Sequence, residues 1–224
     1  PGKMLLARAY YLNDNANEAI NVLRSIEKPD KDVSALLEII RSNGNMSVES
    51  LEKMLETNPS DSYALGKLCI AARTIDPQKA LEYCERALIL DKENINHAIG
   101  YGAALVQLKR YGAAAAVLTN LLKHSPENYT IHANLATALF QMDNFEAAKN
   151  EYSWIIAKEP EIPIAYYFLA ISHDRLQEYA DALQNYREFR DRADPDDNML
   201  EIEKVDLRIP ILIDQIKRGK GKKK

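Results

Sequence analysis

Four alanines recur along most of the chain at a constant spacing of 34 residues, at Ala80, Ala114, Ala148 and Ala182. A bulky residue lies four positions after each alanine. An aromatic residue lies three positions before the last three, at Tyr111, Phe145 and Tyr179. Residues at these separations share one face of an α-helix. A period of this length indicates a fold made of repeated units rather than one irregular core.

Each unit reads as a pair of helices. A second segment with helical apolar periodicity precedes each alanine helix, as in residues 131–142 and 165–176, and a polar turn separates the two. Pro126 and Pro160 follow the alanine helices and end them. The small alanine lets two antiparallel helices approach closely. Because one hairpin cannot bury its own apolar surface, the pattern predicts an all-α solenoid of stacked antiparallel helix hairpins.

The repeated residues resemble the tetratricopeptide repeat (TPR) family. Its pattern places a small residue after an apolar one in the first helix, as in Leu135-Ala136 and Leu169-Ala170, and then the alanine helix and a closing proline. The resemblance implies about six TPR-like repeats. It also implies a non-catalytic scaffold that binds a segment of another protein in a concave groove, lined by the first helix of each hairpin.

The chain divides into three regions. Residues 1–195 form the predicted TPR solenoid, whose second repeat is degenerate, with helices at about 32–42 and 47–57 on either side of Asn43-Gly44. Residues 196–216 are apolar enough for a C-terminal capping helix. A proline inside a helix costs about 3 kcal/mol, so we expect a kink at Pro210. Residues 217–224 are a basic tail that we expect to be disordered.

The resemblance places candidate contacts on the first helices, in columns that repeat every 34 residues. The columns examined contain no lysine, which disfavours a charged clamp for an acidic carboxyl-terminal tail. They predict an apolar or small-lined groove for an extended or helical segment. The alternative is that these side chains only pack on their neighbours or under the cap. The predicted groove contacts are Asn134, Thr137, Phe140, Gln141, Tyr167, Phe168, Ile171 and Arg175.

No motif for catalysis, a cofactor or a metal is found. The four histidines lack ligand spacing, and no serine or cysteine lies in a nucleophile motif. Cys69 and Cys84 fall on helix faces that should be buried, so we expect inert core thiols, with a helix-to-helix disulfide as the lesser alternative. The sequence therefore favours a binding protein over an enzyme.

The net charge is negative over residues 1–216 and positive over the C-terminal tail. The net charge is -4, and the last eight residues carry six positive charges, so residues 1–216 sum to -10. The alternative function is an adaptor that binds nucleic acid or an anionic membrane surface through this tail. The acidic body opposes nucleic acid, so we expect a protein partner. The compartment stays open between the cytoplasm and, if an N-terminal signal was removed before Pro1, a bacterial envelope; the oligomeric state is not predicted.

Overall fold

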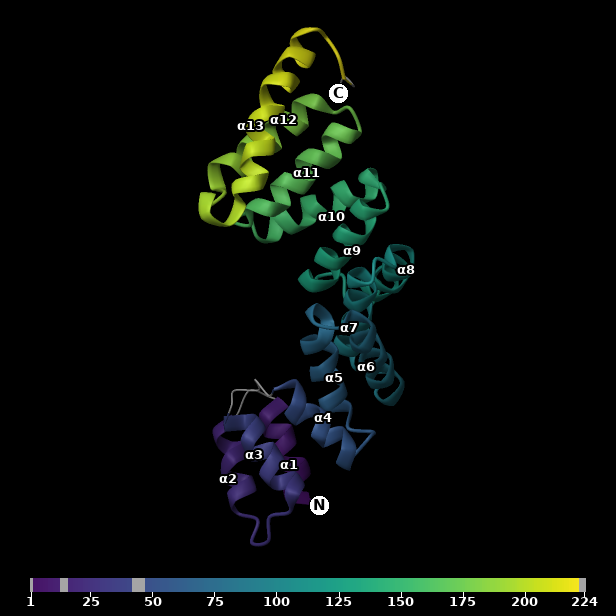
Figure 1. Cartoon of the computed structure of the whole chain (residues 1–224), viewed down its shortest axis with the longest axis vertical. Helices are drawn as coiled ribbons and strands as arrows, with labels where there is room; N and C mark the ends of the chain where they lie inside the picture. Colours follow the sequence, from purple (N-terminus) through teal and green to yellow (C-terminus); the bar gives the residue numbers. More distant parts are fainter. Residues whose placement is uncertain (1, 13–15, 42–46, 222–224) are drawn as a thin grey trace.

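The computed structural model describes residues 2–12, 16–41 and 47–221, and they form helices that follow one another along an elongated molecule (Figure 1). The helices of successive repeats are α1 Gly2–Leu12 and α2 Ala16–Arg24, α3 Lys31–Arg41 and α4 Val48–Thr57, α5 Ser62–Ala71 and α6 Pro77–Leu90, α7 Ile95–Gln107 and α8 Tyr111–Leu122, α9 Tyr129–Gln141 and α10 Phe145–Lys158, α11 Pro163–Arg175 and α12 Tyr179–Arg192. The cap is α13 Pro195–Lys217, and a short 3-10 helix, η1 Ala72–Thr74, follows α5. The predicted all-α solenoid is confirmed. No described helix is both long and apolar enough to cross a membrane.

The alanines lie where the two helices of each hairpin cross. Ala80, Ala114, Ala148 and Ala182 are all fully buried. The partner helix is equally small at some crossings, because a Cβ added at Gly102 would lie 2.8 Å from Cδ2 of Leu118. Close helix approach, and not only hydrophobicity, therefore fixes the small residues of the repeat.

The turns inside the last three hairpins share a left-handed residue. Lys109, Asp143 and Gln177 have φ angles of 58°, 56° and 63°, again at intervals of 34 residues. The amide that follows each of them bonds back into the first helix; Glu178 N donates to the His173 carbonyl at 2.8 Å. This is the Schellman ending, usually occupied by glycine. The sequence predicted a polar turn at these places but gave no sign of this backbone conformation.

The expectation of free thiols at Cys69 and Cys84 is wrong. The two sulfur atoms form a disulfide that joins α5 to α6, with their Cα atoms 4.8 Å apart. Both residues are buried, and Cys69 Sγ packs where a Cβ on Gly100 of α7 would be, at 2.6 Å. The two helices approach closely here because Ala80 lies on the same face of α6, which brings the cysteine side chains together.

The cap covers the last hairpin as expected, but its irregularity lies elsewhere. Ile202, Val205 and Leu212 of α13 are buried against the preceding helices. Non-helical backbone angles occur at Asn198, whereas the helix assignment continues through Pro210. Because Pro210 is exposed, water can hydrate the carbonyl that loses its hydrogen bond there. The Asn43-Gly44 stop and residues 222–224 of the tail lie outside the described residues.

The hydrophobic core is interrupted near the N-terminus. Helices α1, α2 and α3 form one apolar cluster, and a second begins at α4 and continues to α9; Met54 borders both. Helix α5 packs on α7, and α7 on α9, but α3 has no comparable backbone contact with α5 among the described residues. Helix α5 reaches the first cluster through the Tyr63 side chain, without the close backbone contact that it makes with α7.

Candidate interaction site

The predicted groove contacts lie on α9 and α11, and the structure brings their aromatic members together. Phe140 and Phe168 meet edge to face with ring centroids 5.0 Å apart, and the Tyr152 ring of α10 stacks on Phe168 at 5.6 Å. The Arg175 guanidinium lies 5.7 Å from the centroid of the Phe145 ring. These rings fill the space between successive hairpins and pack against one another.

The other predicted contacts are also engaged within the chain. Tyr167 is only 8% exposed and packs against Tyr186 and Phe189 in the core that α13 completes. The Asn134 side-chain amide donates to the Thr130 carbonyl, while Ile171 packs against the same core as Tyr167. Thr137 donates to the carbonyl of Ala133, and Gln141 is exposed. The structure does not bring Tyr167 to a hollow surface, and the binding role of the set stays a prediction.

A large hollow lies instead in the N-terminal half, with a volume of about 1240 Å³. Three helices each present one face to it, with residues at positions i, i+3, i+4 and i+7. We call this hollow the N-terminal trough and define it by those residues: Asp32, Ala35, Leu36 and Ile39 of α3; Ser50, Lys53, Met54 and Thr57 of α4; Tyr63, Gly66, Lys67 and Ile70 of α5. The N-terminal ends of α7 and α9 extend it along the face of the first helices.

The α5 side of the trough is cationic. The Lys67 ammonium lies 5.6 Å above the Tyr63 ring, and Arg73 follows in η1. Neither cation forms an ion pair in the part of the chain that the structure describes. Burial lowers the pKa of Arg73, so the chain holds this charge at an electrostatic cost. An anionic group entering the trough would offset that cost.

Tyr63 presents an unsatisfied polar atom at the same wall. Its hydroxyl is buried and lacks a hydrogen-bond partner. Burial raises the pKa of Tyr63, and the neighbouring Tyr11 hydroxyl adds to that shift, although the two hydroxyls do not meet in hydrogen-bond geometry. A buried donor left without an acceptor costs about 1–3 kcal/mol.

The contact between α5 and α7 closes the trough floor. A Cβ on Gly66 would lie 2.7 Å from Cε1 of His97, so the two helices touch through this glycine. Burial lowers the pKa of His97, an effect that the Asp91 charge only partly opposes, which favours the neutral imidazole. His97 is therefore a packing residue at the base of the trough.

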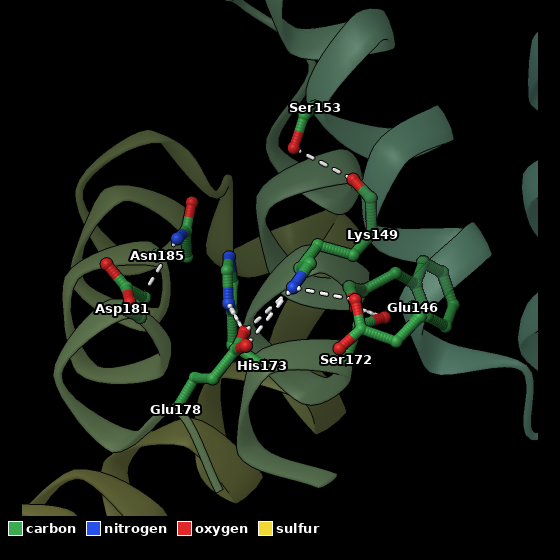
Figure 2. Close-up of polar contacts among 9 residues, drawn as sticks. Glu146, Lys149, Ser153, Ser172, His173, Glu178, Asp181 and Asn185 are labelled. Atoms are coloured by element: carbon green, nitrogen blue, oxygen red, sulfur yellow. Dashed lines mark hydrogen bonds and ion pairs between the residues drawn. The ribbon is translucent and has the colours of Figure 1, made fainter. Parts of the chain in front are cut away.

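Polar side-chain contacts join the helices of the C-terminal repeats. Figure 2 shows the Lys149 ammonium of α10 between two carboxylates, 3.0 Å from Glu146 Oε2 and 3.1 Å from Glu178 Oε2. His173 donates from Nδ1 to the same Glu178 oxygen at 2.7 Å. Burial raises the pKa of Glu178, but the hydrogen bonds from His173 and Lys149 outweigh it and hold that pKa below its usual range.

Among the described residues, His132 and His173 make contacts that hold the helices together. His132 stacks on Trp154 with ring centroids 3.6 Å apart, and its two ring nitrogens contact Glu151 and the Pro126 carbonyl. His173 contacts Glu178, so both inward histidines have a carboxylate partner that the sequence spacing did not reveal. No described group of three or more His, Cys, Asp or Glu side chains is placed to hold a metal ion.

Comparison with known proteins agrees with the repeat geometry. Residues 105–170 match a family model described as tetratricopeptide repeat, and these residues span the hairpins in which the alanines, Schellman turns and packing recur. Residues 105–170 are tetratricopeptide repeats. A comparison with curated protein sequences gives no match.

Solved TPR structures superpose on most of the chain. PilW, a type IV pilus biogenesis factor, gives a TM-score of 0.61 at 19% identity, over 94% of this chain and 86% of that one. MamA from Desulfovibrio magneticus RS-1, starting at residue 41, gives 0.56 at 15% identity, over 90% and 93%. MamA from AMB-1 gives 0.58 at 21% identity, over 66% and 86%. At these identities the likeness establishes the fold of the TPR chain and nothing finer.

Proposed function

We propose that this TPR protein is a non-catalytic scaffold that holds a segment of another protein in the N-terminal trough. The observation that carries the proposal is the set of three helix faces around one hollow. Helix α5 packs on α7, and α7 on α9, whereas α3 and α5 have no comparable backbone contact among the described residues. The hollow between these faces is a place where a polypeptide segment can enter between helices.

The size of the trough favours a polypeptide over a small ligand. Its volume of about 1240 Å³ exceeds the upper range of roughly 1000 Å³ for small-molecule pockets. The walls carry both apolar and polar side chains over two helical turns, which suits a segment lying along the helices. Ile70, at 56% exposed, and the Tyr63 ring provide apolar contact at the two ends of the α5 wall.

The polar groups of the α5 wall indicate which chemical groups a partner segment carries. Lys67 and Arg73 lack carboxylate partners, and the Tyr63 hydroxyl lacks an acceptor. A segment that carries carboxylates beside apolar side chains matches the two cations. The proposed role is binding alone, because the described residues around the trough include no arrangement of a nucleophile with a base.

Affinity capture with the full chain tests the proposal. Ile70→Asp places a charge on the α5 wall, while Ile89→Asp makes the same change on α6, where Ile89 is 63% exposed and outside the trough. We expect quantitative mass spectrometry to find proteins captured by the wild type and by Ile89→Asp but lost with Ile70→Asp.

A third variant tests the competing location in the last two repeats. Tyr167→Ala combined with Phe168→Ala empties the aromatic contacts of α11, and circular dichroism checks that the repeats still fold. Loss of capture with this folded double variant, together with full capture by Ile70→Asp, would place the site at the sequence-predicted residues and overturn the trough.

A further inference from the structure

The disulfide between Cys69 and Cys84 lies next to the wall that α5 and α7 present to the trough. Cys69 follows Gly66 by three residues on α5, and Gly66 lines the trough. The Cys69 sulfur also touches α7, because it occupies the place of a Cβ on Gly100, another residue of the trough. The bonded sulfur is therefore part of the contact that sets the distance between the two helices.

Two contacts of this kind hold α7 against α5. A Cβ on Gly66 would lie 2.7 Å from Cε1 of His97, and a Cβ on Gly100 would lie 2.6 Å from Sγ of Cys69. The two contacts are three residues apart on each helix, so they share one face of α5 and one face of α7. Neither contact leaves room for one more heavy atom. A shift at either contact therefore moves the wall of the trough.

Breaking the disulfide requires space that these contacts do not leave. A dithiol reductant supplies two electrons and two protons, so the S–S bond becomes two thiols while the dithiol closes to its own disulfide. Once the bond is broken, the two sulfurs move from bonding distance to ordinary van der Waals contact. Both cysteines are buried in a packed interior, and the Cys69 sulfur already fills the gap at Gly100. The two thiols can separate only if a helix moves.

We propose that the oxidation state of Cys69 and Cys84 regulates the trough. In the disulfide-bonded chain α5 and α7 keep their close contact, whereas in the dithiol chain the separated sulfurs spread the helices and partner capture falls. This inference rests on the proposed function of the trough and adds its regulation. Because both sulfurs are buried, a reductant reaches them only when the hairpin opens, so the state is set as the chain folds.

Hydrogen exchange on the full-length chain tests the effect on the two helices. The chain is unfolded in urea and refolded with glutathione disulfide or with dithiothreitol, and intact mass confirms that the products differ by two hydrogens. We expect the amides of α5 and of the first half of α7 to exchange about tenfold faster in the reduced product. Helices α11 and α12, which lie farther along the solenoid (Figure 1), should exchange alike in both products. Equal exchange of α5 and α7 in the two products, or two free thiols after oxidative refolding, would overturn the proposal.

Two glycine variants test the contact without changing the oxidation state. Gly100→Ala places a methyl group where the Cys69 sulfur lies, so its disulfide-bonded form should show the fast α7 exchange of the reduced wild type. Gly112→Ala lies in open space on α8 and should leave exchange in α5 and α7 unchanged. Slow α7 exchange in Gly100→Ala would show that the sulfur does not set the position of α7 and would overturn the proposal.

Affinity capture with the two refolded products separates this inference from the proposed function. The relevant proteins are those that the oxidised wild type captures and the oxidised Ile70→Asp variant loses. Apparent affinity scales with the fraction of chains in the competent state, so capture of these proteins should fall about tenfold in the reduced wild type. Equal capture by the two wild-type products, with loss in Ile70→Asp, would overturn this inference and leave the proposed function standing. Undiminished capture by the oxidised Ile70→Asp variant would overturn both.

Discussion

Arg208 of α13 grips Asp174 of α11 with two hydrogen bonds of 2.7 Å, from Nε and from one terminal guanidinium nitrogen. The pair links the cap helix α13 to α11, which is the first helix of the last hairpin. The Asp174 side chain is only 13% exposed, and the Tyr186 hydroxyl also points at it, at 3.5 Å. Bidentate geometry and partial burial make this the strongest polar link between the cap and the repeats.

Replacing Arg208 should therefore loosen the cap. Arg208→Gln leaves the Asp174 carboxylate without its partner, and we expect a loss of about 1.5–3 kcal/mol in the free energy of unfolding. Urea denaturation measures the change. Arg190→Gln is the matched control, because Arg190 of α12 pairs with Asp206 of the same cap helix at the surface and should contribute less than about 1 kcal/mol. Equal losses in the two variants would contradict this account.

The left-handed turn residues predict stabilising substitutions. Gln177 has a φ of 63°, a conformation that costs a residue with a Cβ about 1–2 kcal/mol. Gln177→Gly should raise the free energy of unfolding by about 1 kcal/mol, measured by thermal or urea denaturation. Asp143→Gly, at the equivalent turn, should gain less because aspartate tolerates this conformation better. A destabilised Gln177→Gly variant would show that the side chain matters more than the backbone.

The contact of α5 with α7 predicts that one glycine cannot be replaced. A Cβ at Gly66 would lie 2.7 Å from the His97 ring, so Gly66→Ala should cost about 1–3 kcal/mol through displaced packing. Gly112 of α8 has open space around it, and Gly112→Ala should be neutral or slightly stabilising. Circular dichroism melting of both variants separates the steric effect from helix propensity. Similar melting temperatures would contradict the close contact.

Glu178 predicts a contribution to stability that depends on pH. Its folded-state pKa is lowered, so its contacts with His173 and Lys149 stabilise the fold above the pKa of the unfolded carboxyl. That stability is lost as the pH falls through the lower folded-state pKa. Glu178→Gln should flatten the acid side of a plot of unfolding free energy against pH, while Glu146→Gln, at 60% side-chain exposure, should leave it nearly unchanged. An unaltered acid slope in Glu178→Gln would refute the assignment.

The sequence predicted the fold well because helix crossing demands small residues at fixed intervals. The buried alanines and the stacked hairpins follow from that requirement, and the cap follows from the apolar residues of 196–216. The left-handed residues could not be predicted, since Lys109, Asp143 and Gln177 provide no glycine signal. The disulfide depends on how closely α5 and α6 cross, which the sequence does not specify.

The candidate site was harder to predict because listing first-helix positions at intervals of 34 residues assumes that all repeats stack with equal spacing. The predicted contacts all lie on α9 and α11, so the α5 wall with Lys67 and Ile70 was missed. The one sequence signal for the trough is the degenerate second repeat, since an imperfect repeat leaves its successor without a packing partner. Tyr167 was included for its aromatic ring, which the structure uses in the core beneath the cap.

Site-specific photocrosslinking tests the central claim most directly. A photoreactive amino acid at Ile70 points from the α5 wall of the trough, and the same residue at Ile89 reports on the outer surface of α6. The trough account predicts discrete covalent adducts from position 70 and none of the same mass from position 89. Equal adduct patterns from the two positions, or adducts from position 89 alone, would contradict a binding site in the N-terminal trough.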